Sequence, residues 1–257
     1  MAKPLLFESD QIFAIDIGAT FIKFGLTDSR GVLLEEVRRI LMPYPCSPER
    51  LVTVVVREIM VSGCSRVGVG FPGEFKDGHV IQPGNLARPG GITTDVDPIL
   101  EGQWRGFDLQ RALVEASHRD VRVVNDATLA ALGCCEGVGN ELVLTLGTGL
   151  GIALVVNGGL NRIRDVGAEV FVDGRTYDQL VGDFSKSQDE DRWRELLHRA
   201  VSNFATEFAA HVVHLGGGNA KKVDPTIFDD LACRVVINEN DATLRGAAKL
   251  FDGSVGL

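Results

Sequence analysis

The sequence lacks the features of membrane proteins and of disulfide-stabilised or zinc-stabilised proteins. No segment of the 257 residues approaches the ~20 apolar residues of a membrane span, and the N-terminal stretch has no apolar core of signal-peptide length. The five cysteines are odd in number and show no CxxC spacing, so neither a disulfide framework nor a zinc site is predicted. We expect a cytoplasmic protein with free, buried thiols.

An excess of positive charge is also missing. The chain has 26 basic and 35 acidic side chains, for a formal net charge of −9. This balance disfavours sequence-independent binding to nucleic acid or to anionic lipid, so neither a nucleic acid nor a membrane is expected as a partner. Hydrophobic residues make up 45% of the chain, enough for a buried globular core. A small-molecule ligand is therefore the expected partner.

Two glycine-containing turns, each between apolar strands, are the most informative features of the chain. One lies between Asp16 and Lys23, and the other joins the apolar stretches 142–146 and 152–156. Glycines let a hairpin bring backbone N–H groups close to a phosphate, and a threonine adds a hydroxyl. The turn residues expected to contact phosphate are Gly18, Thr20, Gly147, Thr148, Gly149 and Gly151. The pair of turns predicts two phosphate-binding half-sites that face each other across a cleft.

Asp16 and Lys23 each allow two interpretations. A buried carboxylate is costly unless it is paired or metal-bound, so Mg²⁺, bound directly or through water, is a natural partner for Asp16. The alternative for Asp16 is an exposed turn aspartate. Lys23 either counters a phosphate or lies solvated on the outer face.

Asn125 and Asp126 stand between the apolar strand 121–124 and an alanine-rich helix. Strand ends of this kind expose side chains to ligands in α/β proteins, although a simple helix N-cap is the structural alternative. An aspartate that accepts a hydrogen bond from a substrate hydroxyl makes that oxygen a better nucleophile toward a phosphoryl group. Asp126 is therefore the candidate catalytic base.

Two further glycine clusters have weaker signals. Gly68–Gly73 matches GxGxxG, but a loop or hairpin rather than a helix is expected to follow, so a dinucleotide site is disfavoured. Gly216, Gly217 and Gly218 follow the strand 212–215 and would either lie flat against a nucleotide or form a tight turn. His211 and His214 are expected to be packed sheet histidines.

The remaining pattern predicts an α/β protein in which the order β-β-β-α-β-α occurs from residue 11 and, more loosely, again from residue 142. The expected strands are 11–16, 21–27, 32–40, 67–71, 121–124, 142–146, 152–156, 212–215 and 234–237. The expected helices are 48–62, 108–118, one that ends near Cys134, 190–210 and 241–251. A long loop over 72–106 is expected to shape a binding site.

Taken together, these segments resemble the ROK sugar kinases of the sugar kinase, Hsp70 and actin superfamily, and among them most closely the polyphosphate glucokinases. The match runs from Phe13 to Phe251. The resemblance implies a two-lobed ribonuclease H-like actin/sugar-kinase fold, with a duplicated core and a cleft between the lobes. It implies a small N-terminal lobe of residues 1–124 with the C-terminal helix 241–257, and a larger lobe of residues 125–240.

The same resemblance implies roles for individual residues. Asp126 corresponds to the catalytic base and Asn125 to a sugar contact, while Gly73 and Asn85 lie in segments similar to the loop that closes over the sugar. Gly216–Gly218 resemble the adenosine-side glycines. The resemblance also implies Mg²⁺, a phosphoryl donor that is ATP or polyphosphate, and a homodimer.

The chain departs from the family pattern after the second hairpin. A Glu-x-Gly-His element that binds the sugar is replaced by Asp165-Val-Gly-Ala168, so either Asp165 or Glu169 would take the place of the glutamate and the histidine is missing. Such a change should alter substrate choice. The cysteine-rich zinc motif of many ROK proteins is missing too. Several basic residues either bind a polyphosphate chain or are ordinary solvated surface residues. They are Arg162, Arg164, Arg175, Lys221 and Lys222.

The sequence thus predicts a hexose kinase of the glucokinase type, a phosphotransferase with an alcohol acceptor. A catalytically weak sugar- or nucleotide-binding sensor of the same fold is one alternative. An ATPase, or a kinase for a non-sugar acceptor, is another.

Overall fold

The computed structural model describes residues 11–161, 163–164, 166–238 and 241–252. The chain divides into two compact units: the first runs to Leu129 and resumes at Thr243, and the second comprises Ala130–Ala242. Asn125 and Asp126, which the sequence-based division assigns to the second lobe, fall in the first unit.

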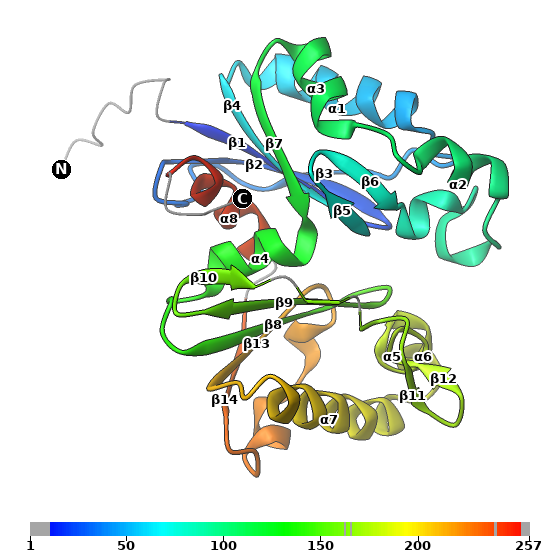
Figure 1. The fold of residues 1–257 in the computed structure, drawn as a ribbon, viewed down its shortest axis with the longest axis vertical. Coiled ribbons are helices and arrows are strands. Elements are labelled where there is room, and N and C mark those ends of the chain that lie inside the picture. Colours follow the sequence, from blue (N-terminus) through cyan, green and yellow to red (C-terminus); the bar gives the residue numbers. More distant parts are fainter. Residues whose placement is uncertain (1–10, 162, 165, 239–240, 253–257) are drawn as a thin grey trace. The chain divides into compact units, whose positions relative to one another are not determined.

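The first unit is built on a five-stranded sheet with the strand order β3-β2-β1-β4-β7 (Figure 1). Strand β2 is antiparallel to β1 and β3, whereas β4 is parallel to β1 and β7. The strands are β1 (Ile12–Ile17), β2 (Phe21–Thr27), β3 (Arg38–Leu41), β4 (Arg66–Phe71) and β7 (Asp120–Asn125). The third expected strand, 32–40, is wrong over its first half, where Leu33 forms only an isolated bridge to Thr27.

Helices and a C-terminal segment cover the first sheet. Side chains of α1 (Pro48–Ser62) and α3 (Leu109–Ser117) join the hydrophobic core with Val67 and Val69 of β4. The opposite face of β4 presents glycines, and a Cβ placed on Gly68 would lie 2.7 Å from Ala247 Cβ. This close approach lets the segment that contains Ala247 pack on the sheet. That segment, expected as one helix, is a short α8 (Ala242–Gly246) followed by a 3₁₀ helix η6 (Ala247–Phe251).

The segment expected as a long loop contains regular structure. It forms a hairpin, β5 (Glu74–Lys76) and β6 (His79–Gln82), two 3₁₀ helices, η2 (Gly84–Ala87) and η3 (Gly91–Thr93), and the helix α2 (Pro98–Trp104). The carboxylate of Asp97 accepts hydrogen bonds from the N–H groups of Ile99 and Leu100, which caps α2. Asp97-Pro98 is thus a helix-start signal within a stretch read from the sequence as irregular.

The second unit repeats the topology of the first, with the strand order β10-β9-β8-β13-β14. Its strands are β8 (Asn140–Leu146), β9 (Leu150–Val156), β10 (Gly159–Asn161), β13 (Val212–Gly216) and β14 (Arg234–Ile237). As in the first unit, three antiparallel strands are followed by two parallel ones. The repeat confirms the expected fold class, a mixed α/β protein with a duplicated core.

Helix α7 (Glu190–Glu207) packs on the second sheet, and α4 (Asp126–Cys134) contains the boundary between the two units. The polar stretch before α7 folds into a small hairpin and two short helices. These are β11 (Val170–Val172), β12 (Arg175–Thr176), α5 (Tyr177–Val181) and α6 (Asp183–Gln188).

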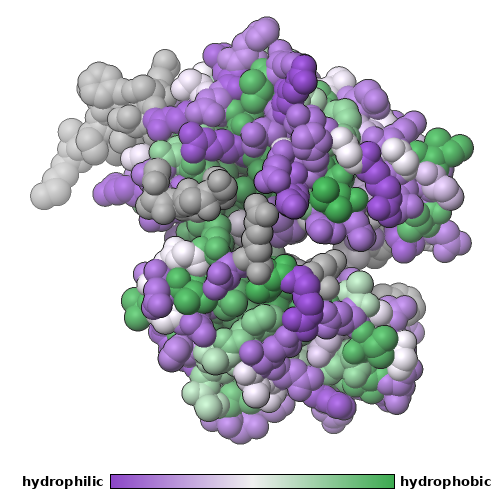
Figure 2. Space-filling view, viewed as in Figure 1, coloured by the Kyte–Doolittle hydropathy of each residue, from purple (hydrophilic) through white to green (hydrophobic). Residues whose placement is uncertain are grey.

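Each unit has its own hydrophobic core around a buried tryptophan. Trp104 Nε1 donates a hydrogen bond to Cys46 O at 2.9 Å, and Trp193 Nε1 donates to Val181 O at 2.8 Å. Hydrophilic side chains cover most of the face drawn in Figure 2, with hydrophobic ones interspersed. Within the described ranges, no helix has the length and apolar character needed to cross a bilayer.

Candidate active site

The parallel strands of the first unit bring the candidate acidic residues to one edge of the sheet. Asp16 of β1 pairs in register with Gly70 of β4, and the following residue of β4, Phe71, pairs with Asn125 of β7. Since the carboxyl ends of parallel strands meet at the same edge, Asp16 and Asp126 come together there although they are far apart in the sequence.

Asp16 and Lys23 form an ion pair at this edge. They are cross-strand partners on β1 and β2, and Lys23 Nζ lies 2.9 Å from Asp16 Oδ2. The Asp16 side chain is only 9% exposed. Asp16 is therefore a buried, paired carboxylate rather than an exposed turn residue, and Lys23 is its partner.

Asp126 has a strongly perturbed acidity. Its pKa is raised to about 7, first by desolvation and then by the Asp16 carboxylate, while the Ala127 N–H and Lys23 act in the opposite direction. The Ala127 N–H donates to Asp126 Oδ1 at 2.8 Å. A carboxyl group with this pKa exchanges its proton near neutral pH, as a general base requires.

Glycine at position 70 makes room for Asp126. A Cβ placed on Gly70 would lie 3.3 Å from Asp126 Cα and 3.2 Å from Leu129 Cδ2. The GxGxxG match therefore consists of packing glycines, and it is followed by the β5 strand rather than by a helix. A dinucleotide site at this position is thus excluded on geometric grounds.

Asn125 connects the base to the loop that follows β4. Its Oδ1 accepts hydrogen bonds from the N–H groups of Ala127 and Thr128, so it caps α4. Its Nδ2 donates to Gly73 O at 2.7 Å. Gly73 has φ +129°, and a Cβ there would lie 2.3 Å from Gln82 O, so only glycine fits this turn.

The expected sugar residue Asn85 belongs to the same group. It lies in η2 directly after Gly84, and a Cβ on Gly84 would lie 3.2 Å from Pro72 O and 3.7 Å from Gly73 Cα. The structure therefore brings Asn85 close to the turn that Asn125 holds.

In the second unit, residues 178–183 pack against the β8–β9 turn and form hydrogen bonds with it. Leu150 N donates to Asp178 Oδ1 at 2.7 Å, and Asp183 N donates to Gly147 O at 2.9 Å. A Cβ on Gly182 would lie 2.2 Å from Thr148 O. The turn that contains Thr148 and Gly149 is therefore fixed by backbone packing as well as by hydrogen bonds.

The third glycine cluster lies beside this turn. Gly217 has φ +87°, and a Cβ there would lie 2.4 Å from Leu146 O, at the end of β8. The Asn219 side chain donates to Asp183 Oδ1 at 2.6 Å, which ties the two segments together. Gly217 thus lies in a tight turn at the end of β13, packed against the end of β8.

The segment that departs from the family pattern is described in part. Asp165 and Arg162 lie outside the described residues. Glu169 forms a bidentate ion pair with Arg164, whose Nη2 also lies 2.7 Å from Glu207 Oε1 on α7. In this structure Glu169 and Arg164 therefore neutralise each other at a partly exposed position.

Sequence reasoning missed a buried cation near the β8–β9 turn. Lys186 lies on α6, one turn after Asp183, and its Nζ is buried 4.3 Å from the centre of the Trp193 ring. Within the described part of the chain, this Nζ has no hydrogen-bond partner. Desolvation, and then Lys222, lower its pKa. Only the fold, which seats α6 on Trp193, distinguishes Lys186 from surface lysines.

The family model for the ROK family matches residues 12–164, which is more than half of the chain. The chain therefore belongs to the ROK family.

Relatives and solved structures agree with this assignment. The chain is 25% identical over 253 residues to polyphosphate glucokinase of Mycobacterium leprae, covering 92% of this chain and 73% of that protein. It is 26% identical to N-acetyl-D-glucosamine kinase of Photobacterium profundum, covering 80% and 83% of the two chains. The inorganic polyphosphate/ATP-glucomannokinase of Arthrobacter sp. strain KM superposes with a TM-score of 0.75 at 30% identity, covering 93% and 97%.

Proposed function

We propose that this protein is a sugar kinase that transfers the terminal phosphoryl group of ATP or polyphosphate to a hydroxyl of a hexose, with Asp126 as the base. The observation that carries the proposal is the Asp126 carboxyl, with a pKa near 7, at the strand edge that also holds Asp16 and Lys23. The names of the relatives favour hexose acceptors and both donors.

The proposed mechanism assigns each group of residues a task. The ionised Asp126 accepts the proton of the sugar hydroxyl as its oxygen attacks the terminal phosphorus. The bond from that phosphorus to the rest of the donor breaks, and ADP or the shortened polyphosphate leaves. Asn125 holds the Gly73 turn, and these two with Asn85 orient the sugar. Backbone N–H groups and hydroxyls would bind the donor phosphates or nucleotide, and they belong to Gly18, Thr20, Gly147, Thr148, Gly149, Gly151, Gly216, Gly217 and Gly218.

The residues at Asp16 fit a magnesium ion. Two carboxylates, Asp16 and Asp126, lie near enough for the first to raise the pKa of the second, and a divalent cation would relieve this repulsion. Lys23 bonds Asp16 Oδ2, so Oδ1 is the oxygen that would hold Mg²⁺ or one of its waters. When bound, the ion would neutralise charge on the transferring phosphoryl group.

The pH dependence of the reaction should follow Asp126. Because the base acts in its ionised form, kcat/KM should rise with pH and level off above a pKa of about 7. Lys23→Met should move this limb to higher pH, since the ammonium lowers the pKa of Asp126. A pH–rate profile of the two proteins measures both effects, and a limb that stays in place in the variant would contradict the assignment.

Lys186 should contribute to donor binding. Its buried ammonium belongs to helix α6. The first residue of this helix, Asp183, donates a backbone hydrogen bond to Gly147 O in the β8–β9 turn. Lys186→Met should raise KM for the donor about tenfold while KM for the sugar stays constant. Thermal stability should not fall, because a buried ammonium is replaced by an apolar side chain. Lys249→Met is the matched control, and an equal donor KM in both variants would refute this role.

A panel of acceptors and donors tests the proposal as a whole. Glucose, mannose and N-acetylglucosamine would each be incubated with ATP and, separately, with polyphosphate. Formation of one sugar phosphate by the wild type, with a defined donor, supports the proposal and identifies the substrate. Nucleotide hydrolysis at a rate that no sugar changes would support the ATPase alternative instead.

The altered segment after the second hairpin favours a second candidate, a sensor that binds sugar or nucleotide and turns over weakly. Ala168 stands where the resemblance leads us to expect a histidine, and Glu169 is occupied by Arg164. Thermal stabilisation by a sugar, without any sugar phosphate, would favour this candidate.

A further inference from the structure

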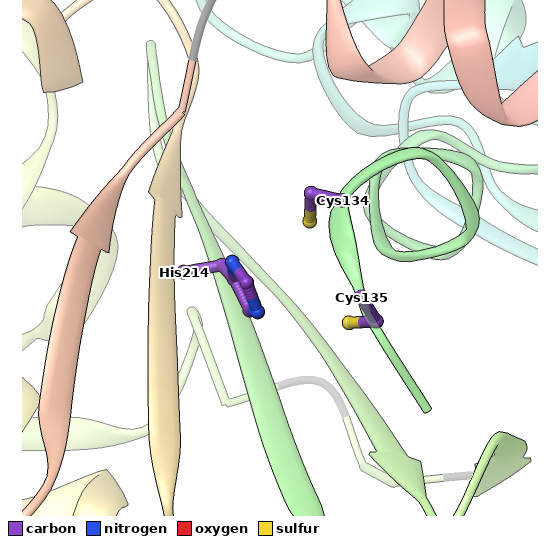
Figure 3. Close-up of side chains that lie close together, drawn as sticks. All are labelled: Cys134, Cys135 and His214. Carbon is purple, nitrogen blue, oxygen red and sulfur yellow. The ribbon is translucent and has the colours of Figure 1, made fainter. Parts of the chain in front are cut away.

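The second unit gathers two thiols and an imidazole in one place that the proposed kinase chemistry does not use (Figure 3). Cys134 is the last residue of α4, Cys135 follows it, and His214 lies within β13. One ligand atom from each residue lies within 4.8 Å of the other two. The three side chains face one another although they come from a helix end and a strand.

Both ring nitrogens of His214 have hydrogen-bond partners, so a bound metal would replace one partner and leave the other in place. His214 is only 3% exposed, with Nε2 3.0 Å from Glu141 Oε2 and Nδ1 3.2 Å from Asn238 Nδ2. An amide can present either its NH₂ group or its oxygen, so Asn238 can serve either tautomer of the ring. When one ring nitrogen binds a metal, the other keeps its partner and fixes the ring.

The Glu141 carboxylate that contacts His214 also holds the loop that follows Cys135. Glu141 is buried, and its two oxygens accept hydrogen bonds from the N–H groups of Glu136, Gly137 and Val138 at 3.0, 2.5 and 3.1 Å. Glu141 thus orders the loop after Cys135 while it also holds His214. The thiols and the imidazole are therefore positioned by one shared group.

We propose that Cys134, Cys135 and His214 bind a zinc ion. Thiolate and imidazole are the ligands that structural zinc sites use, whereas magnesium and calcium prefer oxygen ligands. Two thiolates balance the charge of Zn²⁺, so the bound site adds no net charge to a partly buried place. Binding releases the two thiol protons to solvent, and water takes the fourth tetrahedral position. Both cysteines are partly exposed, which gives the ion and this water access.

This site is separate from the proposed chemistry. Asp126 is the first residue of α4 and Cys134 is the last, so the ion would anchor the opposite end of the helix that carries the base. CxxC spacing does not detect the site because the cysteines are adjacent and the histidine comes from a distant strand.

Metal binding to the full-length, reduced protein tests the proposal. After removal of metal, titration with Co²⁺ should saturate at about one ion per chain and give sulfur-to-cobalt charge-transfer absorption. Zn²⁺ should abolish this absorption by displacing Co²⁺. Cys134→Ser and Cys135→Ser should each lose the band, while Cys233→Ser, which removes a thiol outside the cluster, should keep it.

A second measurement needs no variant. Zn²⁺ should protect Cys134 and Cys135 of the wild type from alkylation, as read by peptide mass spectrometry, and leave the reactivity of Cys233 unchanged. Equal alkylation with and without Zn²⁺, or a cobalt spectrum that survives in the Cys134→Ser/Cys135→Ser double variant, would overturn the proposal. Either result would mean that the cluster consists of packed free thiols beside a sheet histidine.

Discussion

Asp126→Asn should lower kcat for phosphoryl transfer by about 10²- to 10⁴-fold while the protein still folds and binds sugar. Asparagine has nearly the same shape as aspartate, but it cannot accept the proton of the sugar hydroxyl. The loss should therefore appear in kcat, with KM for the sugar little changed. Steady-state kinetics of purified wild type and variant measure this directly.

The same substitution should make the fold more stable at pH 8. The pKa of Asp126 is raised to about 7, above its value in an unfolded chain, so this group makes the folded state less stable as pH rises from about 4 to 7. Removing the charge should increase the free energy of unfolding by on the order of 1–2 kcal/mol.

Asp120→Asn is the matched control for Asp126→Asn. Asp120 is the first residue of β7, the strand that leads into Asp126, and it is exposed. This variant should change neither kcat nor stability appreciably. If Asp126→Asn kept wild-type kcat, Asp126 would not be the base. Because the variant is expected to be well folded, a lower kcat could not be attributed to unfolding.

Gly182→Ala should impair the use of the phosphoryl donor. The new methyl group would lie 2.2 Å from Thr148 O and 2.6 Å from Asp178 O, and both atoms belong to the backbone. The β8–β9 turn must therefore shift. We expect kcat/KM for the donor to fall about 10²-fold and the second unit to lose about 1–3 kcal/mol of stability.

Gly102→Ala is the matched control for Gly182→Ala. Gly102 lies in α2, and a Cβ there meets no atom within 4 Å, so alanine should leave activity unchanged. Donor kinetics and thermal unfolding of the two variants give the comparison. Wild-type donor kinetics in Gly182→Ala would show that the β8–β9 turn is not used for donor binding.

The duplicated topology was predictable because it rests on local patterns, whereas the sequence-based division placed Asp16 and Asp126 in different lobes and so missed that they share one sheet edge. Apolar strands that end in Asp16 or in Asn125-Asp126 point to the carboxyl edge of a parallel sheet, wherever the strands lie in the sequence. The glycine turns were visible for the same reason, since their flanking strands have a clear apolar pattern.

The contacts that fix these turns were not predictable, because they depend on residues from distant segments. The hydrogen bond between Leu150 N and Asp178, and the burial of Lys186 on Trp193, exist only once α5 and α6 are folded onto the hairpin. A local signal for α5 was present: Thr176 and Gln179 form a capping box. The meeting of Cys134 and Cys135 with His214 has no local signal at all.

The most direct test of the central claim is phosphorus NMR of donor, sugar and enzyme, with wild type and Asp126→Asn followed side by side. The account predicts a growing sugar phosphate resonance with the wild type and only a slow trace of it with the variant. A sugar phosphate that forms equally fast with both proteins, or with neither, would contradict it.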